Sequence, residues 1–81
     1  MKADSLVAIT WLDTVSTDKE HSKSEALRQE PITFVTYGRF LGQTKTKVTI
    51  ASTEGWDDDQ KIYRDITTFP FEVIKAIKEV K

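Results

Sequence analysis

Residues 32–52, ITFVTYGRFLGQTKTKVTIAS, decide the fold of this chain. Two glycines interrupt the stretch, and the segments around them have the composition of β-strands. In residues 45–50, Val48 and Ile50 point one way while lysines and a threonine point the other. Because side chains alternate across a strand, this half predicts a strand that is buried on one face and wet on the other.

The first half of the stretch, residues 32–41, is apolar on both faces instead. One face carries Ile32, Phe34 and Phe40, and the other carries Val35, Tyr37 and Leu41. Such a strand needs two coverings, of which one is the core of the domain and the second is another element or another molecule. We therefore expect Val35, Tyr37 and Leu41 to form an interface.

The chain has 81 residues, the size of a single domain, and we take residues 1–81 as one unit. A domain this small buries only about 60% of the surface that its unfolded chain exposes, so small domains often gain stability by self-association. The absence of cysteine excludes disulfides and thiolate chemistry and fits a reducing cytoplasm. The first residues lack the pattern of a secretion signal, and every apolar run is far shorter than the roughly 20 residues of a membrane span. We expect a soluble, cytoplasmic protein.

Two further strands are predicted on either side of the central stretch. Residues 5–13 place Val7, Ile9 and Trp11 on one face and other apolar side chains, Leu6, Ala8 and Leu12, on the opposite face. The strand is therefore predicted to be largely buried on both sides, with Trp11 as a core residue. Residues 61–69 resume an alternation after a polar segment that has the composition of a turn or loop. This loop is predicted to cover residues 53–60.

The polar segment 14–30 lacks a strand or helix period but contains one helix signal. Ser22 and Glu25 have the spacing of a capping box, in which each side chain bonds the backbone of the other. Pro31 cannot continue a helix, so at most two turns fit between residues 23 and 29. The sequence predicts a short helix here, with few apolar residues to anchor it.

Residues 70–81 fit two structures. As a helix, they would start at Pro70 and align an apolar stripe of Val73, Ile74, Ile77 and Val80. As a strand, they would begin with one tight turn and continue to residue 80 with Ile74, Ala76 and Val80 facing inward. Helix propensity alone slightly favours the helix, so on the residues alone a fold with five strands and an α+β fold with a C-terminal helix both stay open.

Four short motifs follow one another along the chain: Trp11-Leu12-Asp13, Pro31 followed by Thr36 and Gly38, Ala51-Ser52, and Pro70 followed by Ile74 and Ile77. In this order they resemble small uncharacterised proteins of phages and mobile elements, including cyanophage-type proteins with an SH3-like or Sm-like β-barrel. The resemblance implies a mainly β fold, namely a small five-stranded barrel with a short helix in the 14–30 insertion. For a phage protein it also implies the cytoplasm of the host cell. Sm proteins themselves begin with a helix and line an RNA pocket with a glycine-containing signature, whereas no Arg-Gly pair follows Ile62 here.

Basic and aromatic residues of the predicted strands form a candidate nucleic-acid surface: Tyr37, Arg39, Lys45, Lys47, Lys61, Tyr63 and Arg64. Positive side chains beside aromatic rings suit RNA or single-stranded DNA, whose bases stack on the rings. The alternative is a solvated face whose charges protect an edge strand from unwanted pairing. The whole chain has 12 basic and 13 acidic side chains, so affinity for nucleic acid would have to come from a local patch.

The sequence offers no catalytic, metal or cofactor motif. His21 is the only histidine, and there is no cysteine or second histidine to complete a triad or a metal pair. Glu54 and the aspartates 57–59 lack the spacing and the glycine of a calcium loop, so we interpret them as an acidic solvated turn. Trp56, beside this turn, is predicted either as an exposed interface residue or as a cap over the core.

We therefore predict a non-enzymatic binding module that forms a homo-oligomer, with a ring as one arrangement. Two functions stay open. One is an Sm-like assembly that binds RNA or single-stranded DNA. The other is a protein–protein adaptor or structural assembly component without a nucleic-acid role. Neither requires a cofactor, a membrane or a small-molecule substrate.

Overall fold

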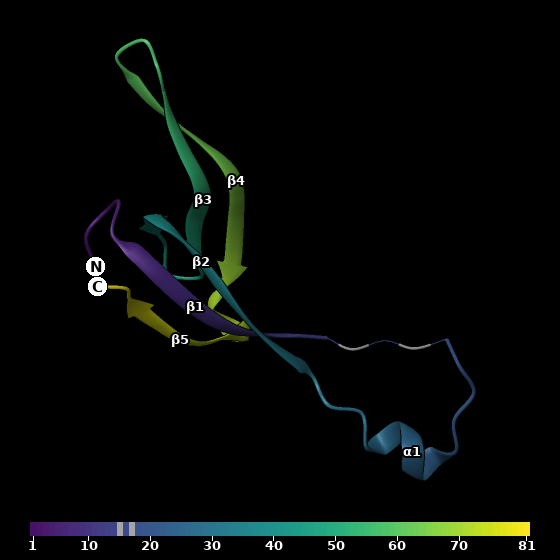
Figure 1. Cartoon of the computed structure of the whole chain (residues 1–81). Helices are drawn as coiled ribbons and strands as arrows, with labels where there is room; N and C mark the ends of the chain where they lie inside the picture. The colour runs from purple at the N-terminus through teal and green to yellow at the C-terminus, as the bar shows by residue number, and fades with distance from the viewer. Residues whose placement is uncertain (15, 17) are drawn as a thin grey trace.

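The computed structural model describes residues 1–14, 16 and 18–81 and shows a mainly β protein (Figure 1). Its elements, in chain order, are β1 (Leu6–Asp13), α1 (Lys23–Leu27), β2 (Ile32–Gln43), β3 (Lys47–Asp57), β4 (Gln60–Pro70), the 3₁₀-helix η1 (Phe71–Val73) and β5 (Ile74–Glu79). All five strands pair antiparallel in one open sheet, in the order β4-β3-β2-β1-β5. The prediction of a mainly β fold is confirmed, and β4 and β5 are the two edges of the sheet.

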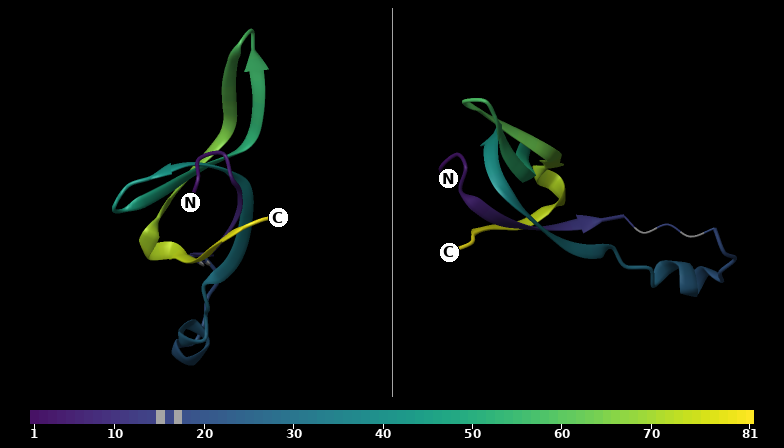
Figure 2. Two further views of the ribbon diagram at one scale, coloured as in Figure 1. Left: turned by 90° about the vertical axis from the view of Figure 1, so that its left-hand side faces the viewer. Right: turned by 45° about the horizontal axis from the view of Figure 1, so that its top comes forward.

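The sheet is curved, with one side around the core and the other side facing outward (Figure 2). Two irregularities in strand pairing accompany the curvature: β2 slips against β3 between Phe40 and Gly42, and β1 slips against β5 between Thr10 and Trp11. Bulges of this kind bend a strand and increase its local twist. None of the helices in the described residues has the length or the apolar character to cross a membrane.

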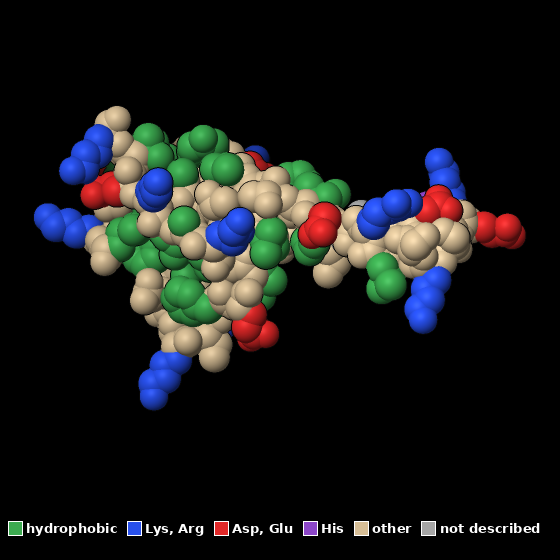
Figure 3. Space-filling model, turned by 90° about the horizontal axis from the view of Figure 1, so that it is seen from below, with side chains coloured by type: hydrophobic (Ala, Val, Ile, Leu, Met, Phe, Trp, Pro, Cys, Tyr) green, Lys and Arg blue, Asp and Glu red, His purple; other side chains and the backbone are tan. Residues whose placement is uncertain are grey.

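Beyond the other strands, β1 and β2 continue as a two-stranded ribbon toward α1 (Figure 1). We call residues 18–31 the arm; it stands away from the body of the molecule and is covered largely by charged and polar atoms (Figure 3). The predicted capping box is confirmed, because Ser22 Oγ accepts a hydrogen bond from Glu25 N at 3.2 Å and Glu25 Oε1 accepts one from Ser22 N at 3.3 Å. None of the residues of α1 is buried.

The C-terminal segment forms a strand, so the alternative of a C-terminal helix is wrong. After the single turn of η1, β5 pairs with β1 and covers what would otherwise be an open edge of the central sheet. The backbone N–H of Phe71 also bonds Thr46 O at 2.9 Å, which ties η1 to the turn between β2 and β3. The pairing shift in β1 brings Ile74 and Ile77 against the core, in place of the predicted set of Ile74, Ala76 and Val80.

Two predicted boundaries around β3 also change. β3 begins at Lys47, so Lys45 lies in the turn before it and not in the strand. β3 and β4 pair as far as Asp57 and Gln60, which shortens the predicted loop of residues 53–60 to a tight turn. Residues that favour turns are held in strands here because cross-strand pairing outweighs their local preference.

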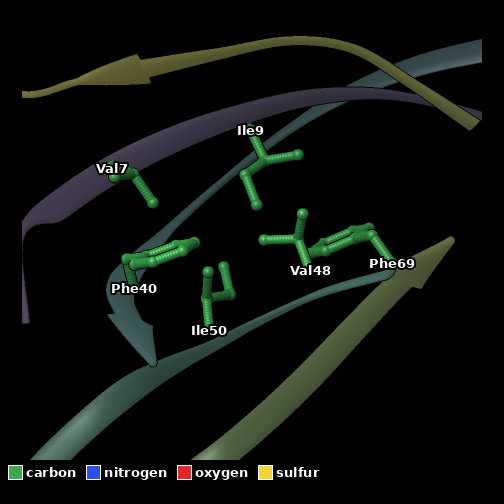
Figure 4. Close-up of a cluster of buried hydrophobic side chains, with 6 residues drawn as sticks. All are labelled: Val7, Ile9, Phe40, Val48, Ile50 and Phe69. Atoms are coloured by element: carbon green, nitrogen blue, oxygen red, sulfur yellow. The ribbon is translucent and has the colours of Figure 1, made fainter. Parts of the chain in front are cut away.

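The core lies inside the curve of the sheet, where six buried side chains point toward one another: Val7, Ile9, Phe40, Val48, Ile50 and Phe69 (Figure 4). Trp11 packs against this cluster and stacks on Phe34 with ring centroids 5.2 Å apart. Its indole N–H donates to Thr36 Oγ1 at 2.8 Å. Phe34 itself stays 43% exposed, because the first part of β2 pairs with β1 alone.

Candidate interaction face

The outward side chains of β1 and β2 form an apolar surface that we call the outer face: Leu6, Ala8, Thr10, Leu12, Val35 and Tyr37. Strand pairing sets Ala8 opposite Tyr37 and Thr10 opposite Val35. Val35 is 48% exposed and Tyr37 is 59% exposed, whereas the alternate residues Val7 and Ile9 are fully buried. The alternation that builds the core therefore leaves a second apolar surface on the other side of the same two strands.

The charged residues at the margin of the outer face are Arg39, Lys78 and Glu54, and Glu54 pairs with Arg39. Arg39 lies opposite Leu6 on β2, and Lys78 lies opposite Ala8 on β5. The remaining outward position of β5 within this pairing is Ala76, opposite Thr10. An apolar centre with one basic residue at its margin, Lys78, that has no ion pair among the described residues suits a partner that brings apolar side chains and a carboxylate.

The two other predicted interface residues lie elsewhere. Leu41 is half-buried beside the irregular pairing of β2 with β3 and lines a shallow pocket of about 170 Å³ with Lys47. Trp56 lies near the tip of the β3–β4 hairpin, 68% exposed, and lines a pocket of about 210 Å³ with Ile62 and Arg64. The indole is thus a surface group and does not cap the core.

A charged cluster connects the N-terminal segment to three strands. Glu54 on β3 pairs with Arg39 on β2, at 3.4 Å from Nε, and with Lys61 on β4, at 3.1 Å from Nζ. Asp4 accepts a hydrogen bond from the Tyr63 hydroxyl at 2.6 Å, and its carboxylate is 4.0 Å from Lys61. The hydrogen bond to Glu54 raises the pKa of Lys61, and the hydrogen bond to Asp4 raises the pKa of Tyr63.

The structure divides the predicted nucleic-acid residues among separate places. Arg39, Lys61 and Tyr63 come together, but their donor groups are already paired with the carboxylates of Glu54 and Asp4. Lys45 and Lys47 lie at the other end of β3, about 30 Å from Lys61 at the rise of an extended strand. Tyr37 lines a pocket of about 250 Å³ with Arg39 and Glu54 at the margin of the outer face, and Arg64 stands apart in the pocket beside Trp56.

Sequence reasoning missed the two carboxylates that organise this cluster. Asp4 precedes the first strand and is 59 positions away from Tyr63, so no local pattern connects them. The sequence predicts a solvated turn at Glu54, whereas the residue lies within β3 between two cations. Opposite charges on adjacent strands would have been a usable signal only once the strand register was known. In the described part of the chain, His, Asp and Glu side chains form no group of three or more that would hold a metal ion.

Comparison with protein-family models, with curated proteins and with solved structures finds no match for this chain.

Proposed function

We propose that the protein is a non-enzymatic binding module that associates with protein chains, in the first place with copies of itself, through the outer face. The observation that carries the proposal is the exposure of Val35 and Tyr37 on the part of β2 that pairs in regular register with β1 alone. Tyrosine is among the side chains that contribute most to protein interfaces, because its ring is large and its hydroxyl stays polar. The cytoplasm, predicted from the cysteine-free composition, is the compartment in which we propose that it acts.

The proposal includes an SH3-like or Sm-like barrel as the finer description of the fold. The strand order β4-β3-β2-β1-β5 and the single 3₁₀ turn before the last strand support it. In such a barrel the edges β4 and β5 would approach each other, and the outer face would remain available on the outside. The phage or mobile-element origin rests on the sequence resemblance alone and stays a prediction.

Measurement of the molar mass in solution tests self-association. We expect light scattering coupled to size-exclusion chromatography at tens to hundreds of micromolar to give a multiple of the 9.3 kDa chain mass. The double variant Val35→Glu/Tyr37→Glu should be a monomer, because it places charges where apolar groups must be desolvated. Ile62→Glu is the matched control, since Ile62 is 37% exposed on the β3–β4 hairpin, away from the outer face. A wild-type monomer throughout this range would contradict the proposal.

Binding of RNA or single-stranded DNA is the second candidate function. Lys45 and Lys47, at the exposed turn between β2 and β3, favour it, because the described residues give neither lysine an ion pair. We expect labelled single strands to bind with an affinity that falls steeply with salt and is lost in Lys45→Ala/Lys47→Ala. The control Lys75→Ala/Lys78→Ala removes the same charge from β5. Absence of binding at low salt would reject this function.

A further inference from the structure

We propose that the arm of one copy lies across the outer face of a second copy, with α1 in contact with it, and that the exchange is reciprocal. The inference rests on the proposed function and names the element that covers the outer face. Three observations carry it: an apolar side chain at the tip of the arm, an excess of exposed surface, and complementary charge.

The arm carries an apolar side chain that stays exposed to solvent in the single chain. Leu27, at the end of α1, is 75% exposed, and Ile32, where β2 leaves the arm, is 45% exposed. A helix of five residues is too short to be stable in isolation, yet this one carries both halves of a capping box. A helix that is capped in this way and has no buried residue is in the form that a contact with another molecule would use.

The exposed area gives the amount of surface that a partner should cover. The molecule exposes 6410 Å², whereas a compact monomer of its 9.3 kDa mass exposes about 5,000 Å². The excess of about 1,400 Å² lies within the roughly 1,000 to 2,500 Å² that each subunit of a stable homodimer buries. The radius of gyration is 16.6 Å, against about 12 Å for a compact domain of this length. The excess of exposed surface therefore belongs to parts that project from the body.

The charges of the arm complement those of the outer face. Residues 18–30 carry four carboxylates and three basic side chains. Of the two basic residues beside the outer face, Arg39 is already paired with Glu54, whereas Lys78 has no ion pair among the described residues. On the same surface, Leu27 would contact Thr10, Val35 and their apolar neighbours. A partner with an exposed leucine and an excess of acidic groups is what this face suits, and the arm has both.

The arm of the same chain does not reach this surface, because the ribbon carries it away from the body (Figures 1 and 2). The long axis of the molecule is 58 Å, while the two others are 24 and 23 Å. A second copy is therefore the source of the arm, and a two-fold axis lets each copy supply one arm and one face. Such a dimer has two equal contacts, which doubles the area that one arm buries.

The cysteine-free chain allows a direct test by disulfide trapping. We expect Leu27→Cys chains mixed with Thr10→Cys chains to form a mixed disulfide dimer under mild oxidation, since Thr10 lies at the centre of the outer face. Leu27→Cys mixed with Ile62→Cys is the control and should give only background crosslinking. If the double variant Leu27→Cys/Thr10→Cys forms an intrachain disulfide as a monomer, the arm covers its own face and the inference is overturned.

The dissociation constant of the dimer distinguishes a failure of this inference from a failure of the proposed function. Leu27→Asp should raise the dissociation constant of the dimer at least tenfold without changing the melting temperature of the monomer, because Leu27 is exposed in the single chain. If Leu27→Asp dimerises like the wild type while Val35→Glu/Tyr37→Glu is monomeric, the outer face associates without the arm and only this inference fails. If the wild type never dimerises, both proposals fail.

Discussion

At the scale of single residues, Tyr63 shows how one hydrogen bond ties the N-terminal segment to the body. Its hydroxyl donates to Asp4, while Asp4 N bonds Phe40 O at 2.7 Å and Asp4 O accepts from Arg39 at 3.3 Å. Asp4 has a φ of 66°, a left-handed backbone conformation that aspartate adopts more readily than most residues. The side chain of Asp4 thus secures a backbone turn through contacts that only the folded chain supplies.

The titration of Tyr63 follows from this contact. The hydrogen bond to Asp4 holds the proton on the phenol, so we expect the pKa of Tyr63 to lie above the ordinary 10.0. Because the folded-state pKa is the higher one, the contact stabilises the protein fully below pH 10 and is lost as pH rises through the raised pKa. Ultraviolet titration of a Tyr37→Phe variant, which leaves Tyr63 as the only tyrosine, measures this pKa. Adding Asp4→Ala should lower it, and an unchanged midpoint would show that Asp4 does not hold the proton.

At the scale of elements, β2 contributes side chains both to the core and to the outer face. Its inward side chains enter the core at Phe40, and its outward side chains Val35 and Tyr37 are two of the six residues of the outer face. Gly38 lies between these regions, directly before the first residue pair of β2 with β3, Arg39 and Ala51. A Cβ atom built at Gly38 would be 2.7 Å from Ala51 O, so the close approach of the two backbones depends on the missing side chain.

We therefore expect Gly38→Ala to destabilise the protein by about 1–3 kcal/mol, because a backbone carbonyl cannot move aside without breaking strand pairing. Gly42→Ala is the matched control on the same strand, since a Cβ there meets nothing within 4 Å. The control should be neutral or stabilising by about 0.4–1 kcal/mol. Chemical denaturation measures both values, and equal effects of the two substitutions would contradict the close-approach explanation.

At the scale of the whole molecule, the stability of the body and the presence of the arm are separable. All six residues of the core cluster lie outside the arm, and no residue of α1 is buried. The arm therefore contributes little to the free energy of unfolding of the single chain. The arm instead lengthens the molecule, which is more than twice as long as it is wide.

Replacement of residues 18–29 by a Gly-Ser-Gly linker tests this separation. At a concentration where both chains are monomers, we expect the melting temperature to shift by less than about 4 °C, which corresponds to less than about 1 kcal/mol. The radius of gyration from X-ray scattering should fall below the 16.6 Å of the intact chain. Loss of cooperative unfolding in the shortened chain would show that the arm belongs to the folding unit.

The sequence alone determined the features that depend on neighbours along the chain. Alternation placed Val7 with Ile9, and Val48 with Ile50, on a common strand face, and the capping box located α1, because side-chain period and helix caps are local properties. The tertiary structure decided the rest. It made the C-terminal segment a strand, extended β3 and β4 into the predicted loop, and gave Arg39 and Lys61 a shared carboxylate in Glu54. These outcomes depend on strand register between distant segments, which sets the hydrogen-bond partners of an edge and the neighbours of a charge, and no local pattern encodes that register.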